Sequence, residues 1–95
     1  MVKLIWTDLA IDDLKSTHDY ISLDSRVYAR RQVSKIIKRV EQLQLQPQSE
    51  RIVPEFSNEN IRELIEGNYR LVYKTIEDKI FIVRIHHSAR LLSAI

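Results

Sequence analysis

The chain has 95 residues, of which 44% are hydrophobic and 29% are charged, and its formal net charge is +2. This length supports one hydrophobic core, so we expect a single soluble domain over residues 1–95 rather than a disordered chain. The sequence has no cysteine, which excludes disulfides, a thiol nucleophile and zinc–thiolate sites. No apolar run is long enough for a signal peptide or a membrane span, so we expect a cytoplasmic protein without a membrane partner.

The first half of the chain predicts a strand followed by two helices. Residues 2–6 form a short apolar run, and Thr7 and Asp8 are both suited to cap a helix N-terminus. The first helix runs toward Asp24, and its apolar positions recur at helical spacing: Ala10, Leu14, Thr17 and Ile21. A second amphipathic helix begins after Ser25 and is expected to end at Pro47. Because the link is short, the two helices should form an antiparallel hairpin.

The two predicted helices carry opposite charge. Residues 8–24 contain five acids and one base, whereas residues 26–39 contain six bases and no acid. At about 100° per residue, the cations opposite the apolar stripe of the second helix are Arg31, Lys35, Lys38 and Arg39. These four residues predict a basic ridge that faces solvent. The ridge is either an ordinary solvated helix surface or a contact for an acidic partner.

The second half of the chain predicts a sheet. Residues 46–60 contain both prolines and read as an irregular connection. Three strand-like segments follow at 61–66, 69–76 and 79–87, separated by pairs of residues that suit hairpin turns. The predicted fold is therefore α+β with the order β-α-α-β-β-β. Its helical hairpin packs on one face of a small, mainly antiparallel sheet.

Strand alternation predicts a basic cluster on the sheet face that the helices leave open. If the strands contain no bulge, this face collects Arg62, Arg70, Lys74, Arg84 and His86 around an apolar floor of Leu64, Val72 and Ile82. His87 should then point to the core side or its margin. We expect the strand and helix aromatics, including Tyr20, to be core residues, whereas Tyr28 could equally lie on the surface.

The basic cluster has the chemistry that RNA cleavage requires. Guanidinium groups hold a phosphate and stabilise its developing charge, and an imidazole transfers protons near neutral pH. The residues in question are Arg62, Arg70, Arg84 and His86, with Glu63 or Glu66 as the nearest carboxylates. A structural hydrogen bond is the alternative role for His86. Adjacent strand residues point apart, so His86 and His87 should not share a metal, and we predict neither a metal site nor a cofactor.

Three segments, 5–21, 61–76 and 80–92, resemble the ParE branch of the RelE/ParE toxin superfamily. The middle segment contains the pattern R-E-L-x-x-G-x-Y-R-x-x-Y, met by Arg62, Glu63, Leu64, Gly67, Tyr69, Arg70 and Tyr73. The last segment contains the closing motif R-x-x-H-x-x-R, met by Arg84, His87 and Arg90. The resemblance covers nearly the whole chain, in the family's order and spacing.

This resemblance implies a toxin of a type II toxin–antitoxin module. Such toxins are wrapped and neutralised by the C-terminal segment of a cognate antitoxin, so we expect a hetero-oligomer. ParE-like members inhibit DNA gyrase without a known set of catalytic residues. We therefore expect a non-catalytic gyrase inhibitor that does not bind specific DNA sequences by itself. Its possible contacts with the target are Arg31, Lys35, Lys38, Arg39, Arg84 and Arg90.

Two alternatives stay open. RelE-like members cleave messenger RNA in the ribosomal A site, and one type ends in Arg-x-His-Tyr, whose first three positions are met by Arg84, Ile85 and His86. In that case the residues that cleave RNA would be Arg62, Arg70, Arg84 and His86. A degenerate toxin that only binds its antitoxin is the other alternative.

Overall fold

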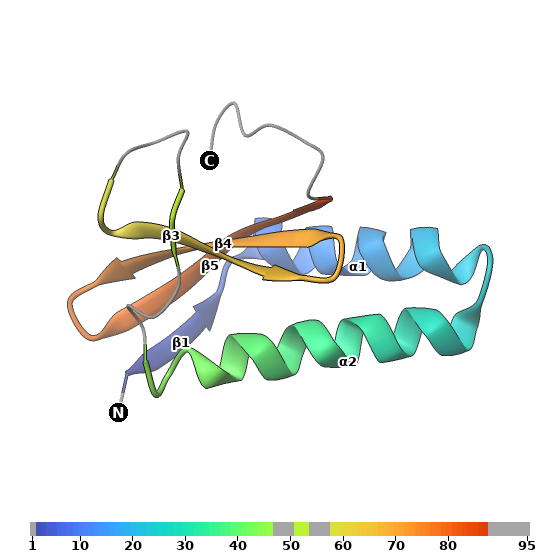
Figure 1. Ribbon diagram of the computed structural model, residues 1–95, viewed down its shortest axis with the longest axis horizontal. Helices are drawn as coiled ribbons and strands as arrows, with labels where there is room; N and C mark the ends of the chain where they lie inside the picture. Colours follow the sequence, from blue (N-terminus) through green and yellow to red (C-terminus); the bar gives the residue numbers. More distant parts are fainter. Residues whose placement is uncertain (1, 47–50, 54–57, 88–95) are drawn as a thin grey trace.

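The computed structural model describes residues 2–46, 51–53 and 58–87 and has the predicted order of elements (Figure 1). The elements are β1 (Lys3–Trp6), α1 (Asp8–Ser22), α2 (Arg26–Gln42), β2 (Arg51–Ile52), β3 (Ile61–Glu66), β4 (Tyr69–Ile76) and β5 (Lys79–His87). The strands form one sheet in the order β1-β5-β4-β3-β2, with β1 parallel to β5 and all other neighbours antiparallel. The α+β prediction is confirmed, and β2 adds a short edge strand within the stretch that we expected to be irregular.

Side-chain caps define where the helices begin. The Thr7 hydroxyl accepts a hydrogen bond from the Ala10 amide at 3.2 Å and donates one to the Ile82 carbonyl at 2.7 Å, so it caps α1 and ties it to β5. Ser25 caps α2 by accepting from the Tyr28 amide. The predicted end of α2 at Pro47 was wrong: the helix ends at Gln42. The next three amides bond to the carbonyls three residues back, which tightens the chain into a turn.

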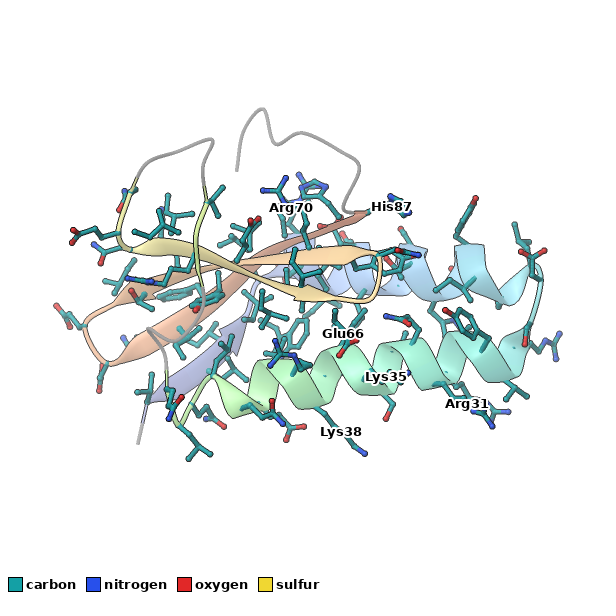
Figure 2. All side chains as sticks on the ribbon, viewed as in Figure 1. Arg31, Lys35, Lys38, Glu66, Arg70 and His87 are labelled. Atoms are coloured by element: carbon teal, nitrogen blue, oxygen red, sulfur yellow. The ribbon has the colours of Figure 1, made fainter. Side chains whose placement is uncertain are left out.

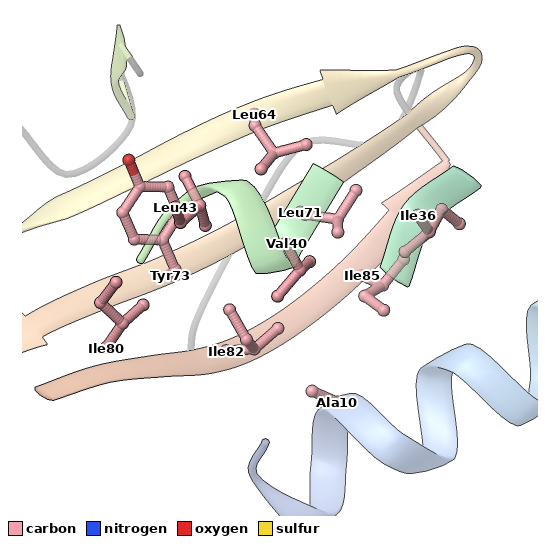
Figure 3. Close-up of a cluster of buried hydrophobic side chains, with 10 residues drawn as sticks. All are labelled: Ala10, Ile36, Val40, Leu43, Leu64, Leu71, Tyr73, Ile80, Ile82 and Ile85. Carbon is pink, nitrogen blue, oxygen red and sulfur yellow. The ribbon is translucent and has the colours of Figure 1, made fainter. Parts of the chain in front are cut away.

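The main core lies between the helical hairpin and one face of the sheet. Ten buried residues build it, contributed by both helices, by the start of the following turn and by β3, β4 and β5 (Figure 3): Ala10, Ile36, Val40, Leu43, Leu64, Leu71, Tyr73, Ile80, Ile82 and Ile85. The predicted packing of the helical hairpin on one sheet face is therefore confirmed. The tip of the hairpin projects past the described ends of the strands (Figure 1).

A smaller apolar cluster occupies the other sheet face. It consists of Val53, Ile61 and Val72, with Val83 packed against them. Val53 follows β2, and its amide donates to the Ile61 carbonyl at 3.2 Å. This face is therefore not the bare surface that the sequence led us to expect, because Val53 and Val72 are both fully buried.

A bulge in β5 overturns part of the predicted sorting of side chains into faces. Val72 pairs with Arg84 but its neighbour Tyr73 pairs with Ile82, so Val83 is the extra residue. An extra residue reverses the alternation beyond it. Ile80 and Ile82 therefore share the helix-facing side with Ile85. The prediction that Ile82 belongs to an open apolar floor was wrong.

The register of β3 against β4 corrects two further positions. Arg62 pairs with Tyr73, and Leu64 pairs with Leu71, so both β3 residues lie on the helix-facing side of the sheet. Alternation within β3 and β4 was predicted correctly, but the face assigned to β3 was wrong. A single strand shows which residues share a face, whereas the partner strand and the core decide which face is covered.

Gly67 should be costly to replace because of its backbone conformation. Its φ is +59°, and an added Cβ would lie 3.4 Å from Gln32 Nε2 of α2. We expect Gly67→Ala to lower the free energy of unfolding by about 1 kcal/mol, measured by urea denaturation. Asn68→Ala in the same turn is the matched control and should change it by less than about 0.5 kcal/mol. Equal stability of the two variants would contradict this interpretation.

Candidate functional site

The basic ridge of α2 is exposed as predicted. Arg31, Lys35 and Lys38 are exposed, and Arg31 and Lys38 point away from the sheet (Figure 2). Arg39 differs from them, because it is half-buried, lies 4.0 Å from the Glu66 carboxylate and donates to the Gln42 side chain at 3.4 Å. Three cations thus remain directed into solvent, where they can meet an acidic surface at long range.

Arg70 is held by a buried carboxylate. Glu63 is fully buried on β3, and the Arg70 Nε donates to its Oε2 at 2.7 Å, with Nη2 in contact with the same oxygen. The two residues lie on the sheet face opposite the helices, one diagonal step apart in the register. This ion pair fixes the Arg70 side chain in a buried position, so its guanidinium group already has a structural role within the toxin.

His86 lies on the same face as Arg70. The two are direct register partners across β4 and β5, and His86 is half-buried. The predicted neighbourhood of these residues therefore exists. Lys74 lies on this face as well, four residues beyond Arg70 along β4.

Arg84 does not join them but reaches over the sheet edge to α1. Its Nε and Nη2 donate to the two Asp13 carboxylate oxygens at 2.8 and 3.2 Å. Asp13 Oδ2 also accepts from the Ile85 amide at 3.0 Å. The strand β1 pairs with β5 only as far as Ile82, so Asp13 caps the edge that β1 leaves uncovered beyond that point. The predicted placement of Arg84 in the open basic cluster was wrong: pairing with Val72 keeps the residue on that sheet face, but its guanidinium turns to Asp13.

No sequence pattern indicated a structural role for Asp13. Its replacement should destabilise the fold. We expect Asp13→Asn to lower the free energy of unfolding by about 2 kcal/mol, because the Arg84 charge and the Ile85 amide lose a charged acceptor. Asp12→Asn is the matched control: its side chain is exposed, and the change should stay within about 0.5 kcal/mol. Thermal unfolding of both variants measures the difference. A similar effect of the two substitutions would sink the assigned role of Asp13.

A groove of about 590 Å³ lies between α1 and the end of β5. Tyr20 and Thr17 line it from α1, and Tyr69 and both strand histidines line it from the sheet. The Tyr69 and His87 rings meet edge to face, with centroids 5.7 Å apart. Burial raises the pKa of the Tyr69 phenol, and the nearby Tyr20 and Tyr28 raise it further, so the phenol stays neutral at physiological pH.

A groove beside the sheet and the helical hairpin was expected, but its aromatic lining was not predicted, because its walls come from distant parts of the sequence. Tyr20 is exposed, so the expectation that it is a core residue was wrong, and Tyr28 is exposed as well, whereas Tyr73 is fully buried. An aromatic wall with hydroxyl groups suits an apolar or aromatic side chain of a partner. In α1 the only sequence signal is that Tyr20 lies beside, rather than within, the apolar stripe.

Other predicted features can be stated briefly. Within residues 2–46, 51–53 and 58–87, no three histidine or acidic side chains are grouped so that they could hold a metal ion. Among the same residues, no helix is both long and apolar enough to cross a membrane. Arg90, the last residue of the closing motif and one of the expected target contacts, lies outside the described residues.

Comparison with known proteins gives consistent matches. The model of the family described as "ParE toxin of type II toxin-antitoxin system, parDE" matches residues 4–92. The structure resembles the chromosomal ParDE toxin–antitoxin system from P. aeruginosa, with a TM-score of 0.76 and 27% sequence identity over 92% of this chain and 96% of that one. It also shares its fold with a chain of the RelBE2 toxin–antitoxin complex from Mycobacterium tuberculosis, with a TM-score of 0.67 and 17% identity over 94% and 93% of the two chains. No curated protein sequence is significantly similar to this chain.

Proposed function

The chain belongs to the ParE toxin family of type II toxin–antitoxin systems, and on this premise we propose that it inhibits DNA gyrase and is neutralised by a cognate antitoxin. The family match over residues 4–92 carries this proposal. We further propose that inhibition occurs by binding and needs no catalytic residue of the toxin.

The arrangement of the arginines supports a binding mechanism. Arg62 lies on the helix-facing side of the sheet, whereas Arg70 lies on the opposite side. Arg70 is paired with Glu63, and Arg84 is paired with Asp13. Cleavage of RNA by this set would be favoured by guanidinium groups gathered around one phosphate, whereas here Arg62 lies on the other face and Arg70 and Arg84 are each paired with a carboxylate.

The basic ridge is the surface that we propose for contact with gyrase. Arg31, Lys35 and Lys38 are exposed on one helix and form a compact positive surface. Such a surface speeds association with an acidic partner and orients it, and its effect falls with ionic strength. Arg84 and Arg90 were also expected contacts. Arg84 is a weaker candidate, because contact with gyrase would compete with its bond to Asp13.

The antitoxin should use a different surface. We propose that an apolar side chain of its C-terminal segment inserts into the groove between Tyr20 and Tyr69. A buried anchor of this kind carries much of the affinity in segment-binding interfaces. The toxin and antitoxin would then form a hetero-oligomer in which the toxin supplies a preformed site.

The test is an assay of purified gyrase with toxin freed from its antitoxin. Supercoiling activity should fall and cleaved complexes should accumulate with the wild-type toxin. The triple variant Arg31→Glu, Lys35→Glu, Lys38→Glu should need at least about tenfold more protein for the same inhibition. The matched control reverses three other exposed cations, Lys3, Lys15 and Lys79, and should inhibit like the wild type. Unimpaired gyrase at saturating toxin would refute the proposal.

One observation favours ribosome-dependent RNA cleavage as a second candidate. Arg70 and His86 are direct register partners, so one guanidinium and one imidazole do share a sheet face. Transcripts from cells that express the toxin would then show new ends at codons, and His86→Ala would abolish them. A toxin that neither cuts transcripts nor inhibits gyrase would instead be a degenerate member that only binds its antitoxin.

A further inference from the structure

The outer face of the helical hairpin carries an unusual symmetric pattern. Ser25 caps α2 and lies between the two helices. Three exposed residues of α1 and its C-cap lie as many residues before Ser25 as three exposed residues of α2 lie after it. The first pair, Leu23 and Val27, lies two residues before and after Ser25. The second pair, Asp19 and Arg31, lies six residues away on either side, and the third pair, Asp12 and Lys38, lies thirteen away. Each matched pair is therefore either apolar or of opposite charge.

Helix geometry places the three residues of each helix along one line on its outer surface. At about 100° per residue, all of them fall within roughly 40° of the direction opposite the buried residues of their helix. They therefore point away from the sheet rather than toward each other within the hairpin. Among the described residues, Asp12, Arg31 and Lys38 make no ion pair, and the Asp19 carboxylate pairs only with the neighbouring His18.

We propose that this face binds a second copy of the chain. A twofold axis that runs parallel to the helices, above the valley between them, places α1 of one copy antiparallel on α2 of the other. Helices that pair in this way bring together residues at equal distances from the hairpin tip. Each matched pair then becomes a contact between the copies, and symmetry repeats it. The result is a four-helix bundle with a sheet on either side.

The charges select this arrangement over its alternative. A twofold axis perpendicular to the helices, in the plane of the interface, would place α1 on α1 and α2 on α2. Asp12 and Asp19 would then face acids, and Arg31 and Lys38 would face cations, which is repulsive. For Asp12, Asp19, Arg31 and Lys38, the parallel axis opposes unlike charges. Lys15 and Lys35 do not meet in it, because they lie on opposite flanks of the line.

Apolar side chains fill the centre and one end of the proposed contact. Asp13 reaches the β5 edge and Arg39 reaches Glu66 of β3, so these residues mark the outer sides of the hairpin. Ile11 and Ile37 lie on the other sides of their helices, along the valley, and are 49% and 37% exposed. The axis would bring the two valleys together. Leu23 and Val27, 82% and 53% exposed, would meet at the tip.

The contact has a regulatory consequence that rests on the proposed gyrase function. It covers Arg31 and Lys38, two cations of the basic ridge, so a dimer would not present the ridge to gyrase. The interface is largely charged and rather small, which sets an affinity in the micromolar range and a strong dependence on salt. Free toxin at low concentration would therefore be the active form.

Sedimentation equilibrium of the purified full chain tests the dimer directly. The wild type should associate with a dissociation constant of tens of micromolar at about 0.15 M salt and at least about fivefold more weakly at about 0.5 M. Asp19→Arg or Arg31→Asp alone should weaken association at least tenfold, and the two together should restore it. Lys35→Asp, the matched control on the flank of α2, should have little effect. A chain that stays monomeric, or association that the swap does not restore, overturns the proposal.

Disulfide cross-linking provides a second test of the dimer, which does not require a measured dissociation constant. The chain has no cysteine, so Leu23→Cys and Val27→Cys each introduce a single thiol. An oxidised mixture of the two variants should contain mainly the mixed disulfide dimer, with several-fold less of either like pair. Equal amounts of like and mixed dimers would refute the register. Because neither experiment involves gyrase, failure of the dimer and failure of the proposed function are distinguishable.

Discussion

Replacing Glu63 with alanine is expected to lower the free energy of unfolding by about 3–5 kcal/mol. Glu63 is fully buried, and both the Nε and the Nη2 of Arg70 contact its Oε2. Removal of the carboxylate leaves the buried guanidinium without its charge partner. Because small domains are stable by only about 5–15 kcal/mol, this change should leave a large fraction of the variant unfolded at 37 °C. Urea denaturation followed by circular dichroism measures it.

Two further variants separate the ion pair from a general effect of truncation. Glu66→Ala removes a half-buried carboxylate three residues along the same strand, 4.0 Å from Arg39, and should cost less than about 1 kcal/mol. The double variant Glu63→Leu, Arg70→Met removes both charges and should recover most of the stability lost by Glu63→Ala. A single Glu63→Ala variant as stable as Glu66→Ala would disprove the structural role of the pair.

The predictable part of this structure is the part that local sequence determines. Residues close in the sequence are enough to predict the helix caps Thr7 and Ser25 and the three strands from Ile61 to His87. They also predict the exposure of Arg31, Lys35 and Lys38. Helical periodicity needs no knowledge of the rest of the chain. The spacing of cations and apolar residues within α2 is therefore enough to locate the basic ridge correctly.

The contacts of the arginines depend on register, and local sequence does not contain it. Val83 is an ordinary strand residue, yet the bulge that it forms places Ile82 on the opposite sheet face from the one predicted. Arg84 is then held by Asp13, 71 residues earlier in the chain (84 − 13 = 71), and no pattern in either segment marks the pair. Arg62 and Arg70 likewise lie on opposite faces because β3 pairs with β4 in one particular register. The prediction that Arg62 shares a face with Arg70 and His86 was wrong for this reason.

The Tyr73→Ala substitution should be about as damaging as the loss of Glu63, for a different reason. Tyr73 is the largest of the fully buried side chains in the described part of the chain, and it packs in the main core beside its register partner Ile82. Truncation removes a large apolar surface and leaves a cavity, so we expect a loss of about 3–5 kcal/mol in the free energy of unfolding. Differential scanning calorimetry should show a fall in Tm of more than about 10 °C for a domain of this size.

The phenol and the ring of Tyr73 contribute separately, and two variants distinguish them. Tyr73→Phe keeps the ring and should cost about 1 kcal/mol, the net contribution of a typical hydrogen bond. Ile76→Ala, an exposed position at the end of β4, should cost less than about 1 kcal/mol. A bound antitoxin would stabilise every variant by mass action, so the measurements require toxin alone. If Tyr73→Phe proved as damaging as Tyr73→Ala, the hydroxyl group and not the packed ring would be the main source of stability at this position.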